Sequence, residues 1–144
     1  MGPTVWLFWD GVAGAAVLAA LAGLHVYWVC GGRFGTGAVI PERDGRPLLA
    51  PSPAATVLVA GLLLAGSACL LARLGVLGQA LPAPVAAGAA WVMAGAFLLR
   101  AIGDFRYVGF FQRPSGSRFA FWDTRLYSPL CVALSVSCAA AVLY

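Results

Sequence analysis

Three ionisable side chains stand out because they lie inside or at the edges of long apolar segments. His25 interrupts an uncharged run, while Asp104 and Asp123 flank a stretch rich in arginine and aromatic residues. An ionisable group within a membrane is costly and often functional. Burial raises the pKa of a carboxyl and a nearby guanidinium lowers it, so one acid would hold a proton while the other stays charged. We therefore expect Asp104 or Asp123 to be a general acid, with the other carboxylate or His25 as base or orienting group.

Aromatic side chains gather beside these groups. Eleven of the seventeen Phe, Trp and Tyr residues fall within segments 27–34 and 105–127. Aromatic faces stabilise desolvated cations by about 0.5–2 kcal/mol each, so these rings would wall an apolar pocket and steady a carbocation. The expected substrate-binding residues are Tyr27, Trp28, Arg100, Phe105, Phe110, Phe121, Trp122 and Tyr127.

Each of these assignments has a structural alternative. His25 would be a neutral imidazole bonded to a neighbouring helix, and the rings would form an aromatic belt at the membrane interface. Arg100 and Asp104 stand four apart, so they would share one helix face and form an ion-pair rim with Asp123. No metal is expected, because His25 is the only histidine and no ligand spacing accompanies it. No cofactor is expected either.

The elements that carry these residues follow from composition. Of 144 residues, 62% are apolar and 10% are charged, and the mean hydropathy is +0.91. A soluble domain needs about 25% charged residues, so a soluble protein and a nucleic-acid binder are excluded. Uncharged stretches cover 11–32, 47–72, 74–99 and 126–144, and a helix needs roughly 20 residues to cross about 30 Å of hydrocarbon. We expect an all-α integral membrane four-helix bundle, one domain over 1–144, with spans at about 8–30, 54–74, 83–103 and 122–143.

The charges also predict an orientation. All nine basic residues are arginines, and all but Arg73 lie in or beside the two long loops, 31–53 and 104–121. Positive charge accumulates on cytoplasmic loops. We therefore expect a multi-pass protein of the bacterial cytoplasmic membrane, with both long loops inside and both termini outside.

Small residues recur every four positions on the expected spans and predict faces where helix backbones approach closely. Pro82 and Pro84 suit the first turn of the third span, where a missing N–H costs nothing. Pro129 is expected to kink the fourth span. The small-residue sets are Gly11, Ala15, Ala19 and Gly23 on the first span, Gly61, Ala65 and Cys69 on the second, and Ala86, Ala90 and Ala94 with Gly88 and Ala96 on the third.

The connectors carry a family resemblance. The strings HVYWVCGGRFG (25–35), VIPERDGRPLLAPSPAATVLVA (39–60), RAIGDFRYVGFF (100–111) and FAFWDTRLYSPLCVAL (119–134) resemble a small bacterial four-helix membrane family that is catalogued as a domain of unknown function. That resemblance covers most of the chain and implies architecture, not activity. In kind, the chain is also similar to small membrane-bound terpenoid cyclases, which protonate an epoxide or alkene on a prenylated substrate.

These observations lead to two hypotheses. The first is a cofactor-independent membrane enzyme, a cyclase or isomerase of a terpenoid or meroterpenoid pathway, acting on a hydrophobic or lipid substrate that enters from the bilayer. The second is a small oligomeric channel or transporter with a polar path lined by Arg, Asp and His. Four short helices enclose little space, so the second hypothesis requires a homo-oligomer.

Overall fold

Four long apolar helices dominate the computed structural model, which describes residues 3–43, 46–78, 80–113 and 116–144. They are α1 (Pro3–Val29), α3 (Pro53–Arg73), α4 (Ala83–Ile102) and a composite of α5 (Arg118–Trp122), the π-helix η1 (Asp123–Tyr127) and α6 (Ser128–Leu143). Each of the four is long and apolar enough to cross a membrane. The predicted all-α class is confirmed, as are four potential spans. The fold is that of a multi-pass membrane protein.

The helix boundaries follow local chemistry. Ser52 accepts a hydrogen bond from the Ala55 N–H at 3.1 Å and Pro53 follows it, a favourable helix start. Pro82 and Pro84 flank the first residue of α4, as predicted. Two spans begin earlier than expected, at Pro3 and Arg118, because the expectation used uncharged windows, whereas a helix extends past the hydrocarbon.

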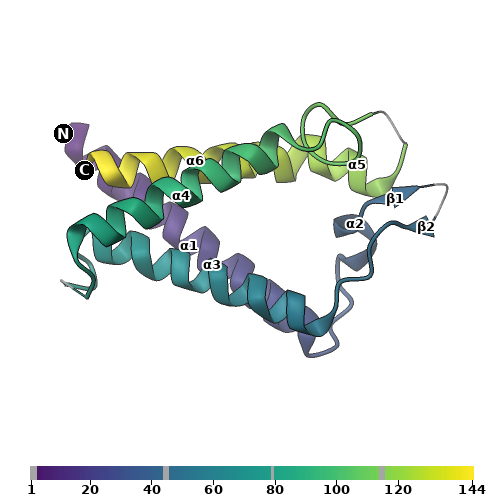
Figure 1. Ribbon diagram of the computed structural model, residues 1–144, viewed down its shortest axis with the longest axis horizontal. Helices are drawn as coiled ribbons and strands as arrows, with labels where there is room; N and C mark the ends of the chain where they lie inside the picture. The colour runs from purple at the N-terminus through teal and green to yellow at the C-terminus, as the bar shows by residue number, and fades with distance from the viewer. Residues whose placement is uncertain (1–2, 44–45, 79, 114–115) are drawn as a thin grey trace.

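Short elements fill the first long connection, which the sequence presented only as a loop. They are α2 (Thr36–Val39) and the antiparallel strands β1 (Glu42–Arg43) and β2 (Arg46–Pro47), with Glu42 opposite Pro47 and Arg43 opposite Arg46. The helix α2 packs against α5. The first connection therefore lies against the second at one end of the bundle (Figure 1).

The four long helices form two pairs. α1 packs mainly on α3, and α4 packs mainly on α6. The Ser67 hydroxyl donates to the Ala15 carbonyl within one pair, and the Ser135 hydroxyl donates to the Ala94 carbonyl within the other, both at 2.8 Å. The pairs meet at the end that carries both termini and diverge toward the end that carries α2 and α5 (Figure 1).

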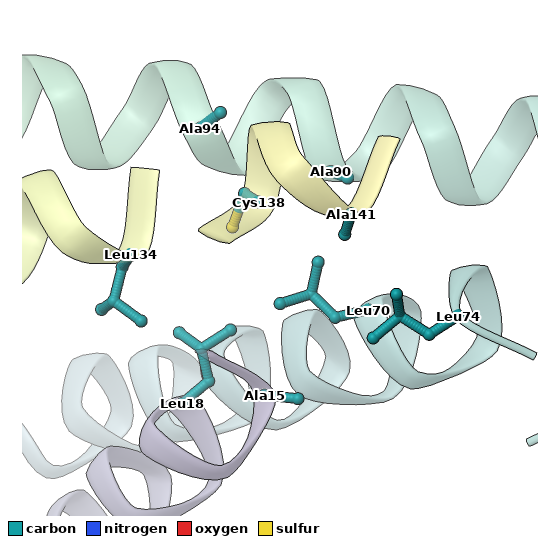
Figure 2. Packing of buried hydrophobic residues seen from close by; sticks show 9 residues of the cluster. All are labelled: Ala15, Leu18, Leu70, Leu74, Ala90, Ala94, Leu134, Cys138 and Ala141. Carbon is teal, nitrogen blue, oxygen red and sulfur yellow. The ribbon is translucent and has the colours of Figure 1, made fainter. Parts of the chain in front are cut away.

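The main apolar core lies where the pairs meet. Leu18 of α1 and Leu70 of α3 point toward α6, and Leu134 and Ala141 point back toward them (Figure 2). Arg73 reinforces this end, because its Nη2 donates to the Val142 carbonyl at 2.8 Å and satisfies a carbonyl that the helix end leaves free.

The small-residue faces are partly as predicted. Ala86, Ala90 and Ala94 are all buried, which confirms that row. Gly61 and Ala65 are exposed, so the predicted face of α3 is wrong. On α1 the predicted set begins buried and ends exposed at Ala19 and Gly23. The reason is that a spacing of four residues advances by about 40° at each step around a helix with 3.6 residues per turn.

Candidate functional site

An ion pair joins the last turn of α4 to the start of η1. Arg100 Nη2 donates to Asp123 Oδ1 at 2.7 Å, and Asp123 is fully buried whereas the Arg100 side chain is 35% exposed. The other carboxylate oxygen, Oδ2, accepts the Gly109 N–H at 2.6 Å and a hydrogen bond from Gln112 Nε2 at 3.2 Å. A buried carboxylate needs a partner charge and further donors to offset its lost hydration, and Asp123 has both.

The helix containing Asp123 is locally underwound into a wider, π-helical turn. Pro129 has no N–H to donate, and the Ser128 N–H bonds back to the Asp123 carbonyl, five residues earlier. A π-helical turn thus directly precedes Pro129, at the place where the sequence predicted a kink. Such turns are rare and occur frequently at functional sites.

The loop after α4 is folded around Asp104. Asp104 Oδ1 accepts the N–H groups of Arg106, Tyr107 and Val108 at 2.9, 2.7 and 2.9 Å. The Tyr107 N–H is foremost in holding the pKa of Asp104 below its ordinary value. Asp104 thus shapes the loop that presents the Gly109 N–H to Asp123.

Glycines permit this close return of the chain. Gly103 and Gly109 have φ values of 84° and 91°, and each would place a side chain against the backbone of the other segment.

The expected pairing of Arg100 with Asp104 along one helix face is wrong. α4 ends at Ile102 and Gly103 turns the chain, so Arg100 pairs with Asp123 instead.

A cleft of about 550 Å³ is lined by residues of both helix pairs, near α2 and α5. Its volume is within the usual range of ligand pockets, about 300–1,000 Å³. It is partly open and largely apolar. The lining residues come from both pairs and from α2, and they are Leu21, Leu24, His25, Trp28, Val29, Thr36, Val39, Ile40, Pro51, Ala55, Thr56, Val59, Arg100, Phe119 and Tyr127.

His25 is held in one orientation within this cleft. Its Nδ1 lies 2.8 Å from the Leu21 carbonyl oxygen, and because a carbonyl only accepts, Nδ1 carries a proton. In the neutral ring, Nε2 then keeps its lone pair. The Trp28 ring meets the imidazole edge to face at 5.1 Å. Nδ1 is therefore occupied, and Nε2 is the ring nitrogen left without a hydrogen-bond partner among the described residues.

Arg100 has an unused donor. Its Nη1 is buried and has no hydrogen-bond partner among the described residues. An unsatisfied buried donor costs about 1–3 kcal/mol, and such groups call for an explanation. Because Arg100 also lines the cleft, an acceptor brought by an occupant would offset that cost.

The structure gathers some of the expected site residues and separates others. His25, Trp28, Arg100 and Tyr127 line the cleft, and Asp123 lies directly behind Arg100. Asp104 is exposed in its loop and does not line the cleft. The expected substrate-binding rings that lie outside the cleft, all exposed, are Tyr27, Phe105, Phe110, Phe121 and Trp122.

Sequence reasoning missed Gln112 and the α3 wall of the cleft. Gln112 is the only side-chain amide between Arg100 and Asp123 in the sequence, and a buried carboxylate needs more than one donor, so that signal was available. Ala55 and Val59 carry no such signal because their side chains are ordinary for any span.

Among the described residues, no group of three His, Cys, Asp or Glu side chains is placed to hold a metal ion.

Comparison with known proteins places the chain in a family. The model described as a protein of unknown function (DUF3995) matches residues 18–138. The chain belongs to this family. The resemblance drawn from the connector motifs is thereby confirmed, and the match spans the Arg100–Asp123 pair and every cleft-lining residue of this DUF3995 protein. No curated protein and no solved structure matches the chain, so the likeness to terpenoid cyclases has no support from these comparisons.

Proposed function

We propose that this chain is a membrane-embedded acid–base enzyme that binds a lipid-soluble molecule in the cleft and isomerises it. One observation carries the proposal. The cleft is walled by apolar side chains, and its ionisable lining residues are His25, Arg100 and Tyr127. Apolar pockets with a few convergent polar groups are the usual form of a small-molecule site.

The chemistry follows from the hydrogen bonds of the two charged groups. His25 Nε2 would take a proton from a carbon next to a substrate carbonyl and return it to a different carbon, which moves a double bond and leaves the atom count unchanged. Negative charge would develop on the carbonyl oxygen, and the Arg100 guanidinium would stabilise it. Asp123 acts as a positioning residue because it fixes Arg100 through Nη2.

The same geometry argues for isomerisation rather than cyclisation. Of the expected rings only Trp28 and Tyr127 line the cleft, so few aromatic faces would stabilise a carbocation there. The two carboxylates are also occupied: Asp123 by three donors and Asp104 by three backbone N–H groups. We therefore assign proton transfer to His25 in place of either acid.

We further propose that the divergent end faces the cytoplasm of a bacterial membrane. The exposed arginines at this end are Arg33, Arg46, Arg106, Arg113, Arg118 and Arg125. Both termini lie at the opposite end of the bundle (Figure 1). Positive charge favours the cytoplasmic side, so the termini would lie outside.

The test uses purified protein in lipid nanodiscs with long-chain β,γ-unsaturated ketones in D₂O. Conversion to the conjugated ketone is followed by ultraviolet absorbance, and deuterium uptake is followed by mass spectrometry. We expect His25→Gln to slow conversion by about 10²-fold or more, as for loss of a general base. Trp91→Phe is the control, because Trp91 is exposed on α4 and does not line the cleft.

Absence of conversion by the unaltered protein with every ketone would overturn the proposal, and so would equal rates in His25→Gln. Solute flux across liposomes that requires Arg100 would instead favour the channel or transporter hypothesis.

A further inference from the structure

The charge balance around Arg100 indicates what kind of molecule the cleft selects. Resting on the proposed function, we infer that the substrate has an apolar body and an uncharged carbonyl oxygen, and that a permanently anionic head group is disfavoured. The juxtaposition that carries this inference is the compensated charge of Arg100 beside its unpartnered Nη1.

A lone arginine in an apolar cleft would attract anions, but Arg100 is not alone. The Asp123 carboxylate lies 2.7 Å from its Nη2, so the pair has no net charge. A second carboxylate or a sulfonate placed here would leave one uncompensated negative charge among apolar walls, where desolvated charge is expensive.

The pair still has hydrogen-bonding capacity to offer. Nη1 has no acceptor among the described residues, and guanidinium donors form strong hydrogen bonds to neutral carbonyl oxygens. Nη1 is buried, so reaching such an oxygen requires the guanidinium to turn toward the cleft about its Nη2–Asp123 contact. A carbonyl satisfies the donor without disturbing the charge balance.

The rest of the cleft fits an apolar body. Its remaining walls include Leu24, Val39, Val59 and Phe119, and no Asp or Glu of the described part of the chain lines it. A molecule with one oxygen at its end and hydrocarbon elsewhere would therefore match the lining along its length.

Three probes with equal chain length separate the contributions of the apolar chain, the carbonyl group and a negative charge. They are pentadecane, 2-pentadecanone and pentadecane-1-sulfonate. They compete for the purified protein in detergent micelles at equal micellar mole fraction, and native mass spectrometry measures the bound fractions. We expect the ketone to bind about tenfold more tightly than either other probe, the advantage of one charge-assisted hydrogen bond. Equal binding of ketone and alkane would overturn the inference, as would a preference for the sulfonate.

Two variants test whether Arg100 and its pairing with Asp123 cause this preference for the ketone. Arg100→Gln should abolish the preference for ketone over alkane. Asp123→Asn removes the compensating charge and should shift the preference toward the sulfonate, and a folded Asp123→Asn protein that still prefers the ketone would contradict the charge argument. If that variant does not fold, the three-probe comparison on the unaltered protein decides.

The outcome is separable from the proposed function. His25→Gln should keep the ketone preference while losing isomerisation, because Arg100 and Asp123 are unchanged. Ketone selectivity without any isomerisation would remove the enzymatic proposal and leave this inference standing. Isomerisation without ketone selectivity would overturn this inference and leave the enzymatic proposal standing.

Discussion

Arg100 and Asp123 connect the interior of the protein to its cleft. Asp123 is fully buried at the start of η1, whereas Arg100 is one-third exposed and lines the cleft, and their charged atoms are 2.7 Å apart. The guanidinium is therefore held through Nη2 by a buried carboxylate, while Nη1 has no hydrogen-bond partner among the described residues. The loop that carries Gly109 and Gln112 donates two further hydrogen bonds to that carboxylate.

Removing Asp123 should destabilise the protein strongly. Asp123→Ala leaves the Arg100 charge and the Gly109 and Gln112 donors without their acceptor, which we expect to cost about 3–5 kcal/mol. The double change Arg100→Met with Asp123→Leu removes both charges and should cost less than Asp123→Ala. Unfolding in detergent followed by circular dichroism measures both. Asp10→Ala, at an exposed position on α1, is the control, and an equal loss in that variant would contradict the expectation.

Gly14 should be sensitive to a single methyl group. A Cβ at Gly14 would lie 2.7 Å from Ser137 Cβ of α6, and this contact leaves no flexible side-chain end to yield. We expect Gly14→Ala to cost about 1–3 kcal/mol through overpacking. Gly23→Ala is matched on the same helix with nothing within 4 Å, and it should be neutral or stabilise by up to about 1 kcal/mol through helix propensity. Equal stability of the two variants in thermal melts would disprove this packing.

The loop built on Asp104 should loosen in acid. Its folded pKa lies below the ordinary value of 3.8 because the N–H of Tyr107, with those of Arg106 and Val108, favours the carboxylate. The stabilisation is therefore complete above that ordinary value and is lost as pH falls through the lower folded pKa. Hydrogen exchange, corrected for intrinsic rate, should show falling protection at residues 106–108 over that range. Asp104→Asn should show no such pH dependence, and the same acid loss in that variant would exclude Asp104 as its cause.

Filling the cleft should block binding without disturbing the core. Ala55 lines the cleft, whereas the adjacent Ala54, which is likewise exposed, does not. We expect Ala55→Phe to weaken 2-pentadecanone binding by about tenfold, or roughly 1.4 kcal/mol, because the ring occupies space that the ketone needs. Ala54→Phe should bind as the unaltered protein does. Native mass spectrometry of both variants measures this difference, and equal binding would show that the ketone lies elsewhere.

The membrane fold could be predicted from where charge is absent. Uncharged windows long enough to cross hydrocarbon predicted four spans, and the helices α1, α3, α4 and α5–η1–α6 occupy them. Helix rotation was less predictable. Ala19, Gly23, Gly61 and Ala65 matched a four-residue spacing, yet their exposure depends on which neighbour each helix faces, and this is a tertiary property.

The candidate site was predicted in part. His25 was singled out as an ionisable group in an apolar segment, Arg100 by its spacing from Asp104, and Trp28 and Tyr127 as members of the aromatic cluster. The structure places all four on one cleft. The pairing was not predictable from local spacing, because Gly103 ends α4 before Asp104 can join its face. The π-helical turn ends just before Pro129, six residues after Asp123, and the side-chain partner of Asp123 lies on α4, so neither could be inferred from the residues adjacent to Asp123.

Because the two helix pairs diverge, the packed core and the cleft lie at different ends of the molecule. Leu18, Leu70 and Leu134 hold one end together, while the residues that would meet a guest molecule occupy the other. A substitution at a cleft-lining residue such as Val59 or Ala55 leaves the contacts among those three leucines intact. The cleft can therefore be reshaped by substitution without loosening the packing that joins the two helix pairs.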